Sequence, residues 1–423
     1  MVNQKIIQKM KILFFILLLI TAQVSGQCNA KLNKYITGFD QLKSSSFSFL
    51  DDKLENIKIV GYGEDTHGSA EFTLLAKELI KYLSKQHNFN IIILETGFSE
   101  GLYLNDYVHG RRKDVKKILA EHNSTWRYKT EEFILLMNWI KNYNKTAQTK
   151  ITIYGSEMQY VISDVHRIQN YLSRVGSDYI IKGFEKHLWQ HITEEEKNNY
   201  YNSYSKLKSL FTENYKIFKN KTSEKEVQLA YHQIEVLGQF VSTIQQNVYQ
   251  RKMDLRDLYI AENIEWVLKH ESTKSKALYW AHNVHVGNWI SNGIVDVAGH
   301  HLKKRFRNSY YNIATDFGTG DFFAFAFDPK KDGGGLQKFS FNTIDSSTFT
   351  NCLKTQGKPN AFINLRNAKQ KQPLKNYLEK PLKIMYGAGS TEWGKKTQTV
   401  YIGKAFDAIL YINKVSALNF IKY

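Results

Sequence analysis

The sequence has 423 residues, 42% of them hydrophobic, so it is long enough to bury the cores of about two or three structural units. Its formal net charge of +18 could attract an acidic partner, but the lysines are spread along the chain and no nucleic-acid-binding module is recognisable. These features argue against a nucleic-acid partner. The two cysteines are too few for a cysteine-rich metal site.

The first 26 residues have the pattern of a secretory signal peptide. Three lysines precede the apolar run Ile12–Ile20, and the small residues of Val24-Ser25-Gly26 follow it. The run is short for a membrane span. We therefore expect cleavage near Gly26, export to the periplasm or the medium, and no stable membrane insertion afterwards. A retained signal anchor is the alternative.

Cys28 lies just after the expected cleavage site. A lipoprotein site prefers a small residue before its cysteine, and Gln27 stands there, which argues against lipid anchoring. The other cysteine is Cys352, and in an oxidising compartment the two could form a disulfide. Their spacing does not decide between that disulfide and a free Cys28.

Between residues 27 and 160, apolar β-branched runs alternate with helical patterns, which favours an α/β fold with a mainly parallel sheet flanked by helices. Residues 70–80 carry apolar side chains at helical spacing. Each expected strand ends in, or is followed by, a glycine or a carboxylate. These strands are Ile57–Val60, Asn90–Glu95 and Ile151–Tyr154.

Residues 161–270 contain no strand-like run and carry apolar residues at spacings of three and four, so we expect a helical insertion there. The α/β core is then expected to comprise residues 27–160 and 271–423, with residues 330–358 as a surface excursion. The strands expected after the insertion are Ala277–Trp280, Tyr311–Ala314, Phe322–Ala326, Ala361–Asn364 and Phe406–Ile412.

Carboxylates and histidines stand at the ends of four of these strands. Because the carboxyl ends of parallel strands share one edge of the sheet, we expect these groups to converge. A single histidine there would more simply satisfy a loop backbone, but two clusters of the same kind favour a site. The residues are Glu64 with His67, Glu95, Glu157, and His282 with His285.

Two chemistries suit this set of side chains. In the first, a histidine takes a proton from water, a carboxylate orients it, and a second imidazole or a backbone donor stabilises the oxyanion. No Gly-x-Ser-x-Gly elbow is present to supply a serine nucleophile. In the second, the same side chains bind a divalent metal such as zinc or iron, an alternative that their spacing leaves open.

Five motifs together resemble the erythromycin esterase family, in the order of that family, over about residues 57–412. The resemblance implies an α/β core interrupted by a helical subdomain, and hydrolysis of a macrocyclic lactone ester by water without a metal or a covalent intermediate. The motifs are Gly63-Glu64-x-Thr66-His67-Gly68 with Glu71, Leu94-Glu95-x-x-Phe98-Ser99-Glu100, Arg256-Asp257-x-x-x-Ala261-Glu262-Asn263, Ala281-His282-Asn283-x-His285-Val286 and Phe406-Asp407-Ala408.

The resemblance also implies roles for individual residues. His67 would be the general base, Glu64 and Glu95 would hold or polarise it, and one of His282 and His285 would bind the carbonyl oxygen or the attacking water. Relatives that hydrolyse antibiotics carry an arginine about nine residues after the first histidine, and here that position is Ala76. The missing guanidinium puts a macrolide substrate in doubt more than hydrolysis itself.

Glu157 and Arg256 are the candidates for substrate binding. For Glu157 the alternative is an ordinary loop acid. For Arg256, with Asp257 and Glu262, it is a charge network on a helix face. We expect a small-molecule ester or lactone as substrate and an exported esterase-like hydrolase as the protein. A metal-dependent hydrolase with the same residues and a binding protein without turnover are the competing hypotheses.

Overall fold

The computed structural model describes residues 29–288, 296–326, 335–386, 391–392 and 396–422. The expected signal peptide and Cys28 lie outside these residues, and Cys352 is buried on a helix. Within the described residues no helix is long and apolar enough to cross a membrane.

A mixed sheet forms the centre of the molecule, in the order β1-β8-β12-β6-β2-β5-β3-β4, with β7 and β10 also paired to β6. The six strands from β12 to β4 are parallel, whereas β8 runs antiparallel to β12 and β1 to β8. A separate pair joins β9 and β11. The bounds are β1 Ile36–Gly38, β2 Ile59–Glu64, β3 Phe89–Gly97, β4 Thr152–Glu157, β5 Lys276–His282, β6 Tyr310–Ala326, β7 Leu336–Phe341, β8 Asn360–Asn364, β9 Leu382–Met385, β10 Thr391–Glu392, β11 Thr397–Val400 and β12 Ala408–Val415.

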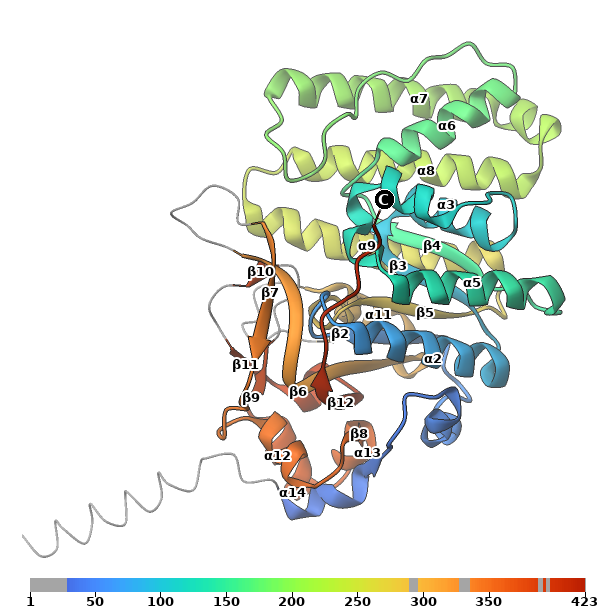
Figure 1. The fold of residues 1–423 in the computed structure, drawn as a ribbon. Helices are drawn as coiled ribbons and strands as arrows, with labels where there is room; N and C mark the ends of the chain where they lie inside the picture. The colour runs from blue at the N-terminus through green and yellow to red at the C-terminus, as the bar shows by residue number, and fades with distance from the viewer. Residues whose placement is uncertain (1–28, 289–295, 327–334, 387–390, 393–395, 423) are drawn as a thin grey trace, which may run out of the picture.

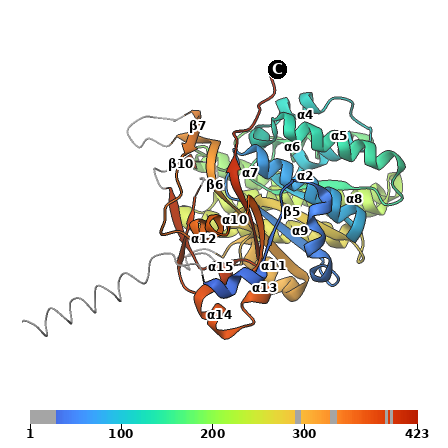
Figure 2. The same cartoon turned by 60° about the horizontal axis from the view of Figure 1, so that its bottom comes forward.

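Helices cover both faces of the sheet and extend beyond its β4 edge. Figure 1 shows α6, α7 and α8 stacked beyond β4, and Figure 2 shows α2 and α5 on the opposite side of the sheet from α9 and α11. The helices are α2 Ala70–His87, α3 Phe98–Val108, α4 Val115–Glu121, α5 Glu131–Thr146, α6 Ile162–Arg174, α7 Glu194–Lys221, α8 Glu224–Ile244, α9 Tyr249–Glu271, α10 Asn283–Val286, α11 Ala298–Phe306, α12 Phe349–Thr355, α13 Leu365–Ala368, α14 Gln372–Leu378 and α15 Ile402–Ala405. Short 3-10 helices are η2 Ala30–Tyr35, η3 Ser44–Lys53, η4 Asn123–Tyr128 and η5 Arg307–Ser309.

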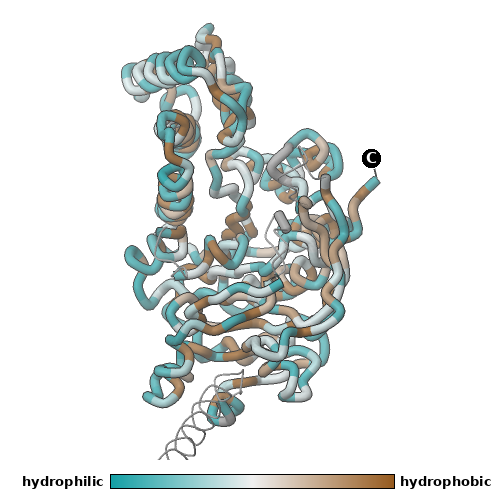
Figure 3. Tube along the Cα trace, turned by 90° about the vertical axis from the view of Figure 1, so that its left-hand side faces the viewer, coloured by the Kyte–Doolittle hydropathy of each residue, from teal (hydrophilic) through white to brown (hydrophobic). Residues whose placement is uncertain are grey.

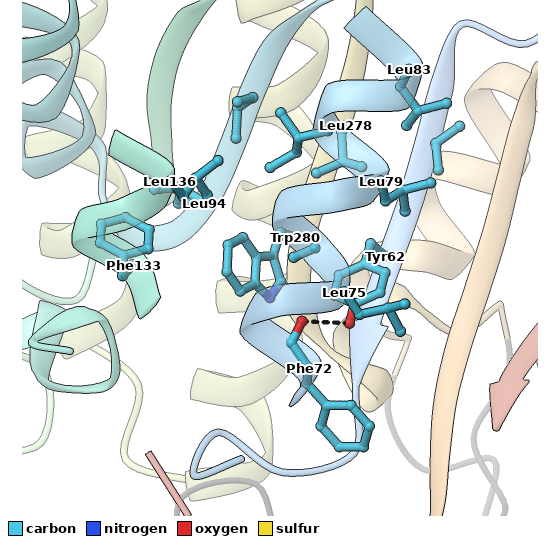
Figure 4. Close-up of a cluster of buried hydrophobic side chains, with 14 of the residues drawn as sticks. Tyr62, Phe72, Leu75, Leu79, Leu83, Leu94, Phe133, Leu136, Leu278 and Trp280 are labelled. Carbon is cyan, nitrogen blue, oxygen red and sulfur yellow. Dashed lines mark hydrogen bonds between the residues drawn. The ribbon is translucent and has the colours of Figure 1, made fainter. Parts of the chain in front are cut away.

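Alternate residues of the central strands enter two hydrophobic cores, because successive side chains of a strand point to opposite faces. Val60, Ile92 and Leu278 pack with α2 and α5, whereas their neighbours Ile59 and Ile91 pack with the helices of the other face. Figure 4 shows the first core, in which the buried Tyr62 hydroxyl donates to the carbonyl oxygen of Phe72 at 2.8 Å. In Figure 3, which is coloured by hydropathy, hydrophobic residues recur along the central strands.

The α/β fold with a mainly parallel sheet is confirmed. Two details differ from the sequence-based expectation. The runs Tyr311–Ala314 and Phe322–Ala326 belong to one long strand, β6, because nothing between them breaks its pairing with β12 and then β7. The segment 330–358 is more than a surface excursion, since it contains β7 and α12.

Residues 161–270 contain α6, α7, α8 and most of α9, joined by loops. Of these, α7 and α8 pack against each other, while α9 also contacts β4 and β5 of the sheet. The division of the chain into an α/β core and a helical insertion stays a prediction, because α9 belongs to both layers.

Candidate active site

The carboxyl ends of the parallel strands bring the predicted residues to one edge of the sheet. Glu64 ends β2 directly beside His282, which ends β5, and Glu157 ends β4 beside the end of β3. Glu95 lies two residues before β3 ends. All of these side chains are buried. A buried carboxylate needs a partner, and each of them has one.

Glu64 and His67 form a dyad. The Nδ1 atom of His67 lies 2.5 Å from Oε1 of Glu64, and the other carboxylate oxygen accepts a hydrogen bond of 3.0 Å from the indole of Trp280. With both oxygens engaged, the carboxylate is fixed. It favours the tautomer of His67 with the proton on Nδ1, which leaves Nε2 as the basic nitrogen.

A glycine holds the loop of His67 against the sheet. The carbonyl oxygen of Gly68 accepts hydrogen bonds from the backbone of Phe323 and Leu418 at 3.2 and 3.1 Å. A Cβ at position 68 would lie only 1.9 Å from the carbonyl oxygen of Phe323, so the close approach requires glycine. This contact fixes the position of the neighbouring imidazole.

Arg127, on η4, places its guanidinium against the imidazole of His67. Its Nη1 lies 2.9 Å from Nε2 and 3.0 Å from Nδ1, so it sits over the ring rather than in line with one nitrogen. Burial, and then the positive charge of Arg127, lower the pKa of His67. The imidazole is therefore neutral near pH 7, as a general base must be.

Glu95 lies between two guanidinium groups. It accepts hydrogen bonds of 2.9 Å from Arg127 and 3.0 Å from Arg256, and a third of 2.9 Å from the backbone N–H of His282. Burial alone would raise the pKa of Glu95. However, Arg127, together with His285, His67 and Arg256, holds it well below its ordinary range. Glu95 is thus ionised and positions both arginines.

Two neighbouring residues of α9 complete the network. Arg256 donates to both carboxylate oxygens of Glu157, and its Nη1 lies 2.9 Å from Nε2 of His285. Asp257 accepts from Nδ1 of His285 at 2.7 Å and from the backbone N–H of Ala298 at 2.9 Å. Burial lowers the pKa of His285, but Asp257 and Glu95 together raise it, and the net shift is upward.

His282 is held by its surroundings. Its Nδ1 accepts from the backbone N–H of Val284 at 3.3 Å, and its Nε2 lies 3.2 Å from the carbonyl oxygen of Asp65. Burial, and then His67 and His285, lower its pKa to about 3. Its ring meets that of His67 edge to face, with centroids 5.5 Å apart. His282 therefore packs against the base as a neutral ring, and its nitrogens are engaged by backbone.

The structure thus brings all seven predicted residues together and adds two that the sequence did not single out for the site. Arg127 carried no signal, because it lies in none of the motifs and about 60 residues from its partner His67. Asp257 was assigned to a charge network on a helix face, whereas it is buried and orients His285. Its position next to Arg256 was the available signal.

The position that the resemblance gives to an arginine, Ala76, is fully buried in the hydrophobic core between α2 and the sheet. The site nevertheless contains guanidinium groups, because Arg127 and Arg256 supply them from η4 and α9. Position 76 therefore adds no side chain to the site, and the identity of the substrate stays a prediction.

The metal alternative fits these contacts poorly. Among the residues that the structure describes, no group of three or more His, Cys, Asp or Glu side chains is placed to hold a metal ion. Arg127 and Arg256 instead direct positive charge at the nitrogens of His67 and His285, where a cation would have to bind. We derive no step through a metal.

Comparisons with known proteins agree on one family. The family model for erythromycin esterase matches residues 84–415. The erythromycin esterase type II of Escherichia coli is 23% identical, over 91% of this chain and 95% of its own.

Solved structures share the fold. A protein from Bacillus cereus is 24% identical and superposes with a TM-score of 0.81, over 94% of this chain and all of its own. A mutant of the erythromycin esterase EreC in its open conformation is 17% identical and superposes with a TM-score of 0.68, over 92% of this chain and all of its own.

Proposed function

Because the chain belongs to the erythromycin esterase family, we propose that it hydrolyses the ester bond of a macrocyclic lactone or a related small molecule, with His67 activating water. The observation that carries this proposal is the Glu64–His67 dyad beneath the guanidinium of Arg127. A neutral, buried, oriented imidazole is what a general base for water requires.

The proposed reaction needs only side chains of the site and water. Nε2 of His67 takes a proton from water, and the resulting hydroxide attacks the carbonyl carbon of the ester. We assign the carbonyl oxygen to a guanidinium N–H of Arg256 rather than to His285, whose Nδ1 is engaged by Asp257 and whose Nε2 lies 2.9 Å from Nη1 of Arg256. When the C–O bond breaks, the leaving alkoxide takes the proton from His67, which gives a carboxylic acid and an alcohol.

The charge of the site supports a cationic substrate, such as a macrolide that carries an amine. Carboxylates outnumber guanidinium groups four to two among Glu64, Glu95, Glu157, Asp257, Arg127 and Arg256. This local excess of negative charge opposes the positive charge of the whole chain. Macrolide inactivation outside the cytoplasm is therefore our specific proposal, with residues 1–26 as the export signal.

The test is turnover of erythromycin and of a panel of simple lactones and esters at neutral pH. We expect a product that has gained one water. Sustained inertness toward the whole panel would contradict the proposal and favour a binding protein.

Chelation should leave activity unchanged. Since cationic guanidiniums flank the histidines, we expect protein treated with EDTA and dialysed to retain its rate to within a factor of about two. The measurement is the initial rate before and after treatment, with metal content determined in parallel. Activity that vanishes on chelation and returns with added zinc or iron would establish the metal-dependent mechanism instead.

The pH profile should have its acid limb below the ordinary histidine range. His67 must be neutral to act, and its lowered pKa places the midpoint of the acid limb of kcat/KM below pH 6.5. Arg127→Met removes the charge that helps to lower this pKa, so the limb should move to higher pH. Arg127→Lys keeps a positive charge and should move it less. A wild-type limb at or above pH 6.5 would contradict the assignment of His67.

A further inference from the structure

Two neighbouring aromatic side chains, with their rings tilted toward each other, lie exposed beside the active site. Trp189, in the loop before α7, and Tyr249, at the start of α9, have ring centroids 5.9 Å apart. Their exposed fractions are 40% and 66%, and Val248 next to them is 64% exposed. Single exposed aromatics are common, but two aromatic rings in contact beside an exposed valine form an apolar surface. We call Trp189, Val248 and Tyr249 the aromatic platform.

The first link from the platform to the site runs along α9. Tyr249 and Arg256 are seven residues apart, so they lie on the same face of the helix, about 10 Å from each other along its axis. Arg256 contacts Glu95, Glu157 and His285. The platform therefore lies two turns from the ester-cleaving residues, on the face of α9 that carries them.

The second link runs through the segment after β4. The indole N–H of Trp189 donates to the side chain of Gln159, and the backbone N–H of Leu188 donates to the carbonyl oxygen of Gln159 at 3.1 Å. The ring of His187 packs on that of Tyr160, with centroids 4.9 Å apart. Gln159 follows the site residue Glu157 by two positions. The loop that carries Trp189 is thus fixed to the edge of the site.

We propose that the aromatic platform is a subsite that binds the apolar face of a large substrate whose ester lies at His67. This inference rests on the proposed hydrolase function and names the substrate class: a ring or ring-bearing ester large enough to reach from its scissile bond to the start of α9. Aromatic faces pack well against broad C–H surfaces, and their polar edges tolerate water. A small acetate ester would not reach the platform.

The experiment compares Trp189→Ala and Tyr249→Ala with the wild type on two substrates, erythromycin and p-nitrophenyl acetate. We expect kcat/KM for erythromycin to fall about three- to tenfold in each variant, through KM, and kcat/KM for the acetate to fall less than twofold. The control is Ile217→Ala, an exposed apolar truncation far along α7, which should change neither. Equal losses on both substrates, or none on erythromycin, would overturn the subsite.

A binding measurement separates this inference from the proposed function. Calorimetric titration of erythromycin into His67→Ala protein, with and without Trp189→Ala, reports the subsite in the absence of turnover. Weaker binding in the double variant supports the platform even if no substrate is hydrolysed. Binding that is unchanged by Trp189→Ala, or absent from the parent, would overturn it.

Discussion

His67→Ala is expected to lower kcat/KM for ester hydrolysis by about a thousandfold and to leave the fold intact. General-base catalysis by a positioned side chain contributes about 100- to 10,000-fold. Of the three histidines, His67 alone combines a lowered pKa with a carboxylate that orients its ring. The nitrogens of His282 are engaged by the backbone, and those of His285 by Asp257 and Arg256. The loss should fall on kcat rather than KM, since the base acts in the transition state.

The matched control is His166→Ala. His166 is an exposed histidine on α6 outside the network, so its truncation should leave kcat/KM within a factor of about two. Circular dichroism and the midpoint of urea unfolding report whether His67→Ala protein is folded. Hydrolysis by folded His67→Ala protein at the wild-type rate would rule out this histidine as the base.

Glu95→Gln is expected to lower the free energy of unfolding by about 3–5 kcal/mol. The substitution keeps the shape of the side chain but leaves Arg127 and Arg256 without the carboxylate that lies between them. Removing one partner of a buried ion pair leaves an uncompensated charge in a medium that solvates it poorly. The charge of Arg127 is left the less compensated of the two, because its next carboxylate, Glu64, is 4.0 Å away. Arg256 retains its ion pair with Glu157.

The comparison for this variant is Glu226→Gln, which breaks the pair between Glu226 and Arg174. The side chains of that pair are 43% and 56% exposed, so its loss should cost no more than about 1 kcal/mol. Urea unfolding of both variants at pH 7 measures the difference. If Glu95→Gln were no less stable than Glu226→Gln, the buried network would not hold the charge that we assign to it.

Because of Glu95, the free energy of unfolding should decrease as the pH falls. The folded-state pKa of Glu95 is depressed, so its contribution is present above the pKa of an ordinary glutamate and is lost as pH falls through the folded value. Wild-type protein should therefore lose stability in acid faster than Glu95→Gln protein does.

The sequence indicated the sheet and its functional edge well, because both depend on local patterns. Apolar β-branched runs mark β2, β3 and β4, and each strand carries, at or within two residues of its end, a glutamate that the structure places at the site. The order of the strands could not be read in the same way. The position of β5 between β2 and β3 depends on contacts across the whole chain rather than on any local run.

The partners of the site residues were harder to predict than the residues themselves. The dyad of Glu64 and His67 follows from a spacing of three on one turn. Arg127 reaches that dyad only because η4 folds back over the sheet. The residues that flank Arg127 in the sequence carry no pattern that predicts this contact. Asp257 was interpreted as part of a charge network on a helix face, because a carboxylate next to an arginine on a helix is typical of such a network. In the structure it is buried and orients His285.

The strand order also has a consequence for how the chain folds. Residues 276–282 must insert between two strands that are complete by residue 97, so an N-terminal fragment cannot close the sheet or assemble the site. Pairings of such long range form slowly, because the intervening chain has to be ordered first. The central sheet would then stay incomplete until nearly three hundred residues have been synthesised, which suits the export that we propose.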